Sequence, residues 1–150
     1  MLIRRARRED YPAFAAIEAG HPGYPAWGEA GFEAEEKNRN SVTLAAEEEG
    51  RVAGFINFWI LRPQVQLNTL AVSPAFLRRG AASALLGKLF EYAAKSACRE
   101  VDLEVNERNA AAIALYGRHG FEVVGKRPKF YNNTDAALLL RKALPSKDQR

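Results

Sequence analysis

Apolar residues in the middle of the chain recur at the spacing of an α-helix. Within SPAFLRRGAASALLGKLFEYAAKSA they follow one another at three- and four-residue intervals; they are Leu85, Leu86, Leu89, Phe90, Ala93 and Ala97. This spacing places an apolar stripe along one side of a helix and leaves the other side polar. The pattern predicts a long amphipathic helix in this segment.

Strands are predicted on both sides of that helix by β-rich and alternating segments. They cover residues 2–5, 41–47, 52–61, 64–72, 99–106, 121–126 and 136–141. In the fifth segment Val101, Leu103 and Val105 alternate with polar residues, so one face is apolar and the other is acidic or polar. Residues 48–51 join the second and third strands as a hairpin turn.

Two shorter helices have recognisable ends. One follows Asp10 and places Phe14 and Ile17 on one side. The other follows Asn109, whose side chain suits a helix cap, and it ends before Gly120, which suits the left-handed conformation that follows many helices.

Two segments are predicted as loops on the substrate side. Residues 21–31, HPGYPAWGEAG, hold two prolines and three glycines between two helix-like stretches, so Tyr24 and Trp27 are expected to be exposed or to pack over the fold. Residues 130–133, FYNN, are expected to line the substrate mouth or to cover the sheet.

The order of the elements is typical of a mixed α/β fold. A length of 150 residues fits one domain. Because 47% of the residues are apolar and 27% are charged, the chain has enough apolar side chains to form its own hydrophobic core. We therefore expect one domain over residues 1–150, with residues 143–150 as a flexible tail.

Composition excludes several classes of protein. No stretch reaches the roughly 18 uncharged apolar residues that cross a bilayer, and the opening MLIRRARRED is charged where a signal peptide is apolar, so a cytoplasmic location is expected. Cys98 is the single cysteine, and His21 and His119 are far apart in the sequence. An intramolecular disulfide is impossible, and no metal site is predicted.

The chain is moderately basic. It has 22 Lys and Arg against 18 Asp and Glu, a net charge of +4, which suits an anionic partner without identifying one. The basic residues form three groups: Arg4, Arg5, Arg7 and Arg8; Arg78 and Arg79; Lys126, Arg127 and Lys129. Of these groups, the middle one is followed directly by a glycine.

The segment that follows the fourth strand has the features of a phosphate site. Arg78, Arg79 and Gly80 precede the helix that begins near Ala81. Unbonded N–H groups at a helix start, its positive dipole end and nearby guanidinium groups all favour an anion, and a glycine lets the backbone approach a phosphate oxygen.

This segment resembles the diphosphate loop of the GCN5-related N-acetyltransferase (GNAT) superfamily, Gln/Arg-x-x-Gly-x-Gly/Ala. The match is Leu77 to Ala82, with Leu77 where the family has Gln or Arg. The segment LEVNERNAAAIALYGRHGFEVVGKRPKFYNNTDAALLLRKAL, which begins at Leu103, is similar to the bacterial ribosomal-protein alanine N-acetyltransferase group. The resemblance covers residues 55–142 well. It implies a GNAT-type fold, a central mixed, mostly antiparallel sheet flanked by about four helices, and acetyl-CoA as co-substrate.

The resemblance also implies roles for individual residues. Glu104 would be the general base and Tyr116 the general acid. The implied cofactor contacts are Leu70, Ala71, Val72, Arg78, Arg79, Gly80, Ala81, Ala82, Ser83 and Asn109.

The residue chemistry is compatible with acetyl transfer to an amine. Glu104 lies on the polar face of its strand, and a positioned base contributes a factor of roughly 10² to 10⁴ in rate. An α-amine with a pKa near 7.8 is about 14% neutral at pH 7, whereas a lysine is about 0.04% neutral. A protein N-terminal α-amine is therefore the first choice of acceptor.

Other readings stay open. In the resembling group the fourth strand begins with acidic residues, whereas here Pro63 to Gln66 are uncharged, so the acceptor is not fixed by the resemblance. A small-molecule amine is one alternative acceptor. Two alternatives come from other functional classes: a non-catalytic acetyl-CoA-binding module and a basic RNA-binding module. No membrane partner is expected, and a nucleic-acid partner is disfavoured. The protein is expected to be a monomer or a homodimer.

Overall fold

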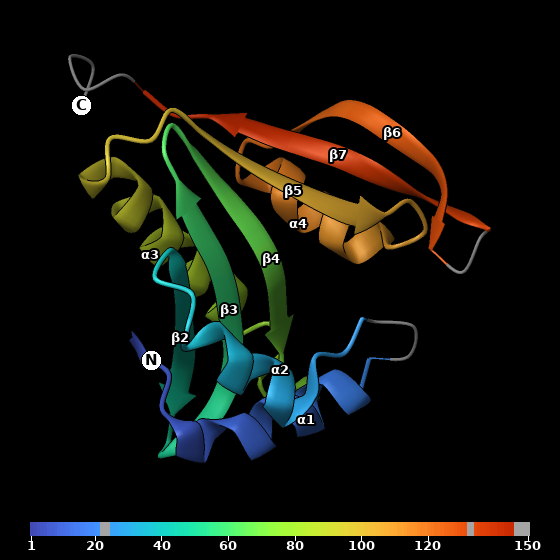
Figure 1. The fold of residues 1–150 in the computed structure, drawn as a ribbon. Coiled ribbons are helices and arrows are strands. Elements are labelled where there is room, and N and C mark those ends of the chain that lie inside the picture. The colour runs from blue at the N-terminus through green and yellow to red at the C-terminus, as the bar shows by residue number, and fades with distance from the viewer. Residues whose placement is uncertain (22–24, 132–133, 146–150) are drawn as a thin grey trace. The chain divides into compact units, whose positions relative to one another are not determined.

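Seven strands and four α-helices form in the computed structural model, which describes residues 1–21, 25–131 and 134–145 (Figure 1). The strands are β1 (Leu2–Arg5), β2 (Ser41–Glu48), β3 (Arg51–Leu61), β4 (Gln64–Val72), β5 (Glu100–Asn106), β6 (Glu122–Tyr131) and β7 (Asp135–Ala143). The helices are α1 (Tyr11–Ala19), α2 (Gly28–Glu35), α3 (Ala81–Lys95) and α4 (Ala110–Arg118), with short 3-10 helices η1 (Arg8–Asp10) and η2 (Pro74–Phe76).

The strands are hydrogen-bonded in the order β1-β2-β3-β4-β5-β7-β6. The β1–β2, β2–β3, β5–β7 and β6–β7 pairs are antiparallel, whereas β4 and β5 run parallel. This confirms the predicted fold class, a mixed, mostly antiparallel sheet with four helices.

The chain divides into two compact units. Unit 1 holds Met1–Ile60 and Asn68–Tyr92, and unit 2 holds Leu61–Leu67 and the chain from Ala93 on. Strand β4 therefore begins in unit 2 and ends in unit 1, and α3 lies mostly in unit 1. The expectation of one domain over the whole chain stays a prediction.

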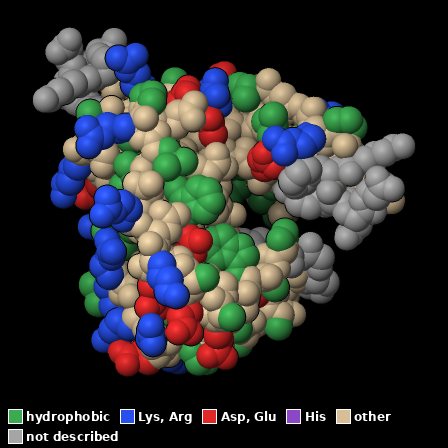
Figure 2. Space-filling model, in the orientation of Figure 1, with side chains coloured by type: hydrophobic (Ala, Val, Ile, Leu, Met, Phe, Trp, Pro, Cys, Tyr) green, Lys and Arg blue, Asp and Glu red, His purple; other side chains and the backbone are tan. Residues whose placement is uncertain are grey.

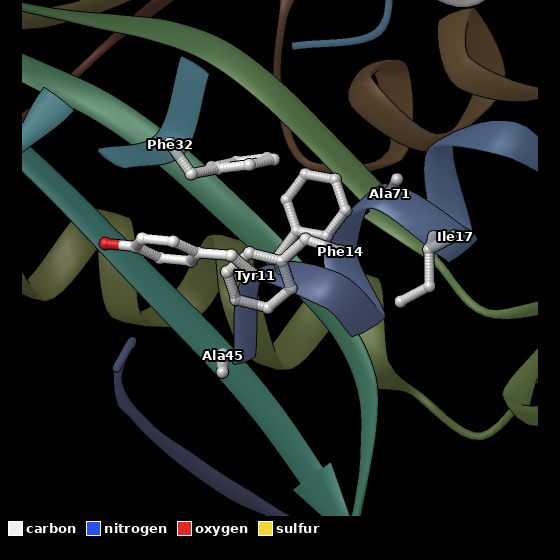
Figure 3. Close-up of a cluster of buried hydrophobic side chains, with 7 residues drawn as sticks. Tyr11, Phe14, Ile17, Phe32, Ala45 and Ala71 are labelled. Atoms are coloured by element: carbon white, nitrogen blue, oxygen red, sulfur yellow. The ribbon is translucent and has the colours of Figure 1, made fainter. Parts of the chain in front are cut away.

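Aromatic rings form the core on one face of the unit 1 sheet (Figure 3). Phe14 of α1 lies 4.7 Å from Phe55 of β3 and 5.1 Å from Phe32 of α2, measured between ring centroids. All three side chains are essentially buried, and each contributes roughly 1.5–3 kcal/mol of transfer free energy. Trp27 packs on Phe32 with ring centroids 5.3 Å apart. Of the two predicted positions of Trp27, exposed or packed over the fold, the structure has the second.

The link between α1 and α2 is shorter than predicted. Helix α2 begins at Gly28, so residues 28–31 of the predicted loop are helical. The cause is Glu18, whose buried carboxylate accepts the backbone N–H groups of Trp27 at 2.8 Å and Gly28 at 3.1 Å. A carboxylate at the start of a helix satisfies N–H groups that have no partner within the helix. Tyr24 lies outside the described residues.

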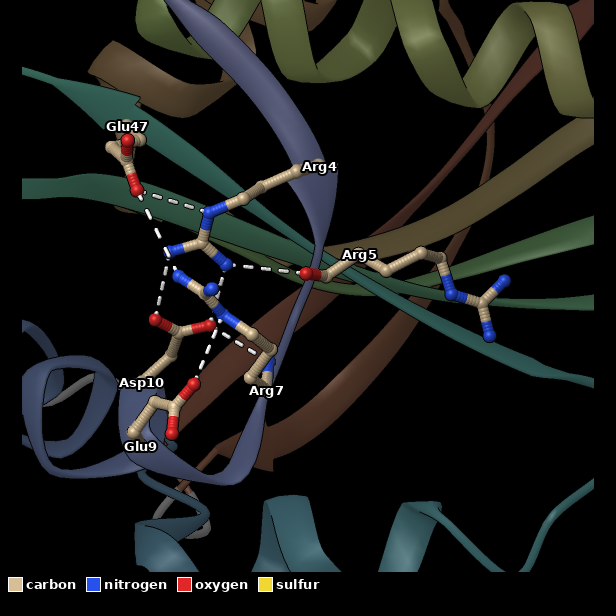
Figure 4. Close-up of polar contacts among 6 residues, drawn as sticks. All are labelled: Arg4, Arg5, Arg7, Glu9, Asp10 and Glu47. Carbon is tan, nitrogen blue, oxygen red and sulfur yellow. Dashed lines mark hydrogen bonds and ion pairs between the residues drawn. The ribbon is translucent and has the colours of Figure 1, made fainter.

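The N-terminal arginines form ion pairs within unit 1 (Figure 4). The Arg4 guanidinium donates to both oxygens of Asp10, at 2.7 and 2.9 Å, and to Glu47 at 3.1 Å. Burial raises the pKa of Asp10, but hydrogen bonds from Arg4 and from the backbone N–H of Arg7 outweigh it, so the pKa lies below its usual value. Arg8 pairs with Glu36 at 3.0 Å.

Acidic and basic side chains lie next to each other on one part of the molecular surface. Figure 2 shows basic and acidic side chains side by side over the lower part of the view, where α1 and α2 lie. Arg4, Arg7 and Arg8 are each within 4 Å of a carboxylate of unit 1. Three of the four arginines of this group are therefore paired with carboxylates of unit 1.

The unit 2 sheet has one apolar face and one polar face. Val101, Leu103 and Val105 of β5 are buried, while the residues between them are only half-buried, as the predicted alternation requires. The Asn109 side chain accepts the Ala112 N–H at 3.1 Å and caps α4, as predicted.

The C-terminal part of the chain holds the two strands predicted there, but both are longer than predicted. Residues 130 and 131, which were predicted in a loop, belong to β6, and residue 143, which was predicted in the flexible tail, belongs to β7. Gly120 has φ +91, the left-handed conformation expected after α4. Strand β7 continues to Ala143, and the Leu144 N–H donates to the Arg99 carbonyl at 2.8 Å. Residues 146–150 of the predicted tail, the side chains of residues 129–131 and residues 132–133 lie outside what the structure describes.

No helix of the described residues is long and apolar enough to span a bilayer. The same residues hold no cluster of three His, Cys, Asp or Glu side chains suited to a metal ion. Cys98 is buried and forms no disulfide, and its thiol donates to the Gln64 carbonyl at 3.7 Å.

Candidate active site

The end of β4 is held by residues from other parts of unit 1. The Val72 carbonyl accepts a hydrogen bond from His21 Nε2 at 3.1 Å; because a carbonyl only accepts, this nitrogen has the proton. A Cβ on Gly54 of β3 would lie 2.7 Å from the Ala71 carbonyl oxygen, so the two strands meet closely only because residue 54 is glycine. Leu70, Ala71 and Val72 therefore form a fixed strand end.

The turn before α3 has a strained backbone. Arg78 has φ +63 and Gly80 has φ +82, both in the left-handed region. The first bond of the helix runs from the Ala84 N–H to the Gly80 carbonyl at 2.9 Å. The N–H groups of Ala81 and Ala82 precede this bond and have no acceptor in the helix itself. With the positive end of the helix dipole, this turn can bind an anion.

The two arginines of the turn differ in their surroundings. Arg79 lies 3.7 Å from Glu48 and 3.9 Å from Glu49, in the turn between β2 and β3. Arg78 is exposed and makes no ion pair or hydrogen bond with any other residue that the structure describes. Leu77, which replaces the polar residue of the family pattern, is 55% exposed and adds no donor from its side chain.

Glu104 lies on the polar face of β5, as predicted. Its Oε1 forms an ion pair with Arg127 Nη2 of β6 at 2.9 Å, and its side chain is 29% exposed. Asp102, two residues earlier on the same face, accepts from Arg141 of β7 at 2.7 and 3.1 Å. Each of these two carboxylates thus has a guanidinium partner of its own.

Tyr116 lies on the buried side of α4. It is 7% exposed, and its ring packs edge-on against Phe121 with centroids 5.5 Å apart. Asn109 precedes it by seven residues, which is two helical turns, so both lie on the same side of α4. This position is typical of a residue that packs in the core, and the acid role of Tyr116 stays a prediction.

The segment between β5 and α4 is tied to the start of β7. The Glu107 N–H donates to the Ala136 carbonyl at 2.9 Å, and the Ala136 N–H donates back to the Glu107 carboxylate at 2.7 Å. Asn106 donates to Asp135 at 3.2 Å. These bonds fix the end of β5 two residues beyond Glu104.

The uncharged start of β4 lies against acidic residues of β5. In the parallel pair Gln64 is opposite Glu100, to which it donates at 2.6 Å, and Gln66 is opposite Asp102. Negative charge is thus present on the neighbouring strand, although β4 itself lacks it.

The predicted site residues fall into one group in each unit. Unit 1 contains all the implied cofactor residues except Asn109; they are Leu70, Ala71, Val72, Arg78, Arg79, Gly80, Ala81, Ala82 and Ser83. Unit 2 holds the implied catalytic residues Glu104 and Tyr116 together with Asn109.

Comparison with known proteins identifies the family. The sequence matches the Acetyltransferase (GNAT) family over residues 3–121. The chain belongs to the GNAT acetyltransferase family. This GNAT protein is 32% identical over 126 residues, 84% of each chain, to the ribosomal protein bS18-alanine N-acetyltransferase of Escherichia coli K12. It is also 34% identical over 123 residues to an uncharacterized protein of Mycobacterium leprae, of which it spans 33%.

A solved structure supports the same assignment. The crystal structure of the ribosomal-protein-S18-alanine N-acetyltransferase from Escherichia coli matches with a TM-score of 0.85 and 26% identity, over 99% of this chain and 98% of that chain. The predicted GNAT fold and family are confirmed. The GNAT protein is an acyltransferase enzyme of the N-acetyltransferase type.

Sequence reasoning missed three residues that shape these regions. Arg127 was named only as part of a basic group, His21 only as one of two separated histidines, and Glu18 was not singled out. Each acts on a residue at least nine positions away, so no local pattern shows it. For Arg127 a signal exists, because both neighbouring carboxylates of β5 need a cation and β6 and β7 supply one each.

Proposed function

We propose that this GNAT enzyme transfers the acetyl group of acetyl-CoA to a protein N-terminal α-amine. The observation that carries the proposal is the turn before α3, where two left-handed residues, Arg78 and Gly80, precede helix N–H groups that suit a diphosphate. The similarity over 84% of each chain to an enzyme named ribosomal protein bS18-alanine N-acetyltransferase supports a protein acceptor.

The proposed cofactor site uses main-chain groups first. The N–H groups of Ala81 and Ala82 would donate to the diphosphate of acetyl-CoA, and Gly80 leaves space, since a Cβ there would have no heavy atom within 4 Å. Arg78 would add a guanidinium that makes no other ion pair among the described residues. An N–H of β4 near Val72 would donate to the thioester oxygen, where negative charge develops.

The proposed reaction is direct transfer. The neutral amine nitrogen attacks the acetyl carbonyl carbon, its surplus proton passes to Glu104, and the bond from that carbon to sulfur breaks. Tyr116 would donate its phenolic proton to the leaving thiolate. The side chain of Glu104 is 29% exposed and so is accessible to solvent and substrate, which supports this role.

An α-amine needs less help from a general base than a lysine side chain does, because more of it is already neutral. At pH 7 about 14% of an amine of pKa near 7.8 is already neutral, against about 0.04% of a lysine. The difference is roughly 300-fold in reactive amine before any catalysis. This supports an N-terminal α-amine over a lysine side chain.

The acceptor is tested with purified enzyme, acetyl-CoA and a panel of amines. Thiol release and mass spectrometry would be followed with peptides that begin with alanine, the same peptides with a blocked N-terminus and an internal lysine, and spermidine as a small amine. Acetylation of the free N-termini alone is expected. Turnover on spermidine but on no peptide would replace the proposal with the small-molecule alternative, and acetyl-CoA binding without turnover on any amine would favour the non-catalytic module.

A further inference from the structure

We propose that Arg127 is a positioning residue that holds the carboxylate of Glu104 in its working orientation. The inference rests on the proposed function, in which Glu104 is the general base. It assigns a task to a residue that neither the family pattern nor the comparisons single out.

The contact itself is close and involves opposite charges. Arg127 Nη2 and Glu104 Oε1 are 2.9 Å apart, a distance typical of a charge-assisted contact. The two side chains are 52% and 29% exposed, so the pair is only partly screened by solvent. A carboxylate has two oxygens, so one can be held while the other accepts a proton.

The strand register explains how the side chain of Arg127 crosses a strand. Glu104 is opposite Leu139 of β7, and Arg127 is opposite Ala137, two residues along the same face. Strands β5 and β6 lie on either side of β7, roughly 10 Å apart. Only a long side chain spans that distance, which arginine provides.

Small residues keep this path open. Ala137 presents no more than a methyl group beneath the arginine. Gly125, which is opposite Leu139, has no side chain, and a Cβ there would lie 3.1 Å from the Leu139 side chain. Larger residues at positions 125 and 137 would occupy the face over which the guanidinium reaches Glu104.

The neighbouring charges do not substitute for Arg127. Arg141 is engaged by Asp102 at 2.7 Å and by Glu100 at 3.2 Å. Among the described residues, Arg127 is the one cation within 4 Å of the Glu104 carboxylate. Loss of Arg127 would leave that carboxylate free to rotate about its side-chain bonds.

Strand β6 has an irregular stretch directly after Arg127, so the contact of Arg127 with β5 helps to hold this part of β6 in place. Pairing of β6 with β7 is regular at Arg127 and then shifts register before it resumes at Tyr131. Arg127 is therefore the last regularly paired residue of that stretch. Its ion pair ties this point of β6 across β7 to β5.

The test is a double-mutant cycle on steady-state kinetics with a peptide acceptor. Arg127→Ala is expected to lower kcat about tenfold and to leave the affinity for acetyl-CoA, measured by calorimetry, within about twofold. Arg127→Lys, which keeps the charge but has a shorter and less directional head, is expected to recover part of the loss. Lys126→Ala is the matched control, because Lys126 is the next basic residue of β6 and pairs with Glu107 instead.

The cycle separates the possible results. In a Glu104→Gln background, Arg127→Ala is expected to change kcat by less than twofold, since Arg127 acts through the carboxylate. An equal loss in both backgrounds would overturn the positioning role and leave Glu104 as the base. Full activity of Glu104→Gln alone would overturn the general base, and this inference with it. If Arg127→Ala does not fold, Arg127→Gln and Arg127→Lys provide the same comparison.

Discussion

The buried carboxylate of Glu18 accepts the backbone N–H of Trp27 at 2.8 Å and so joins the end of α1 to the start of α2. The same carboxylate bonds Gly28 at 3.1 Å. These two bonds fix the point at which the chain enters α2, and Trp27 then packs on the aromatic core.

We expect Glu18→Gln to lower the free energy of unfolding by about 1–3 kcal/mol, because an amide accepts through one oxygen and leaves a buried N–H unsatisfied. Urea denaturation measures this change. Glu29→Gln, an exposed residue in the first turn of α2, is the control and should stay within about 0.5 kcal/mol of the native chain. Equal effects of the two variants would contradict the cap.

The Arg4–Asp10 pair predicts how stability depends on pH. Asp10 has a pKa below its usual value in the folded chain, so its contribution is fully present above about pH 4 and is lost as the pH falls through the lowered pKa. Asp10→Asn should therefore be less stable than the native chain by about 2 kcal/mol at pH 7. It should also lose less stability between pH 7 and pH 3, as thermal unfolding would show. Parallel pH profiles of the two proteins would count against this account.

Alanine substitutions at two glycines of the α3 region are expected to have opposite effects on stability. A Cβ finds open space at both Gly80 and Gly87, but Gly80 has φ +82, whereas Gly87 lies within the helix without a positive φ. Gly87→Ala should stabilise the protein by about 0.8–1 kcal/mol. Gly80→Ala should destabilise it by about 1 kcal/mol and weaken acetyl-CoA binding at least tenfold. Calorimetry that finds unchanged affinity for Gly80→Ala would exclude the turn from the cofactor site.

The arginines of that turn should also differ. Arg79 lies near two carboxylates, whereas Arg78 makes no ion pair among the described residues. Arg78→Ala is expected to weaken acetyl-CoA binding roughly tenfold, as for loss of a charged hydrogen bond, and to reduce its salt dependence. Arg79→Ala should change affinity less than about threefold. The reverse order would assign the diphosphate to Arg79.

Local sequence patterns predicted most of the fold because their causes are local. The alternation of Val101, Leu103 and Val105 marks a strand with one buried face, and the Asn109 cap lies three residues from the N–H that it accepts. Most strand and helix positions agree with the prediction, but α2 begins within a predicted loop, β6 ends at Tyr131 instead of residue 126, and β7 ends at Ala143 instead of residue 141.

Contacts over longer distances in the sequence could not be predicted in this way. Residues 28–31 were expected in a loop, since the Glu18 cap that starts α2 comes from another helix. The pairing of Glu104 with Arg127 depends on the register of three strands, which no window of the sequence contains. The family resemblance implied roles for individual residues, whereas the residues that contact them were known only from the structure.

The most direct measurement is the kinetics of Glu104→Gln with acetyl-CoA and an alanine N-terminal peptide. The proposed mechanism predicts a loss of roughly 10²- to 10⁴-fold in kcat/KM with acetyl-CoA affinity within about twofold of the native enzyme. Glu100→Gln, on the same face of β5 but paired with Arg141, should keep kcat/KM within about threefold. Native kinetics for Glu104→Gln would contradict the general-base mechanism.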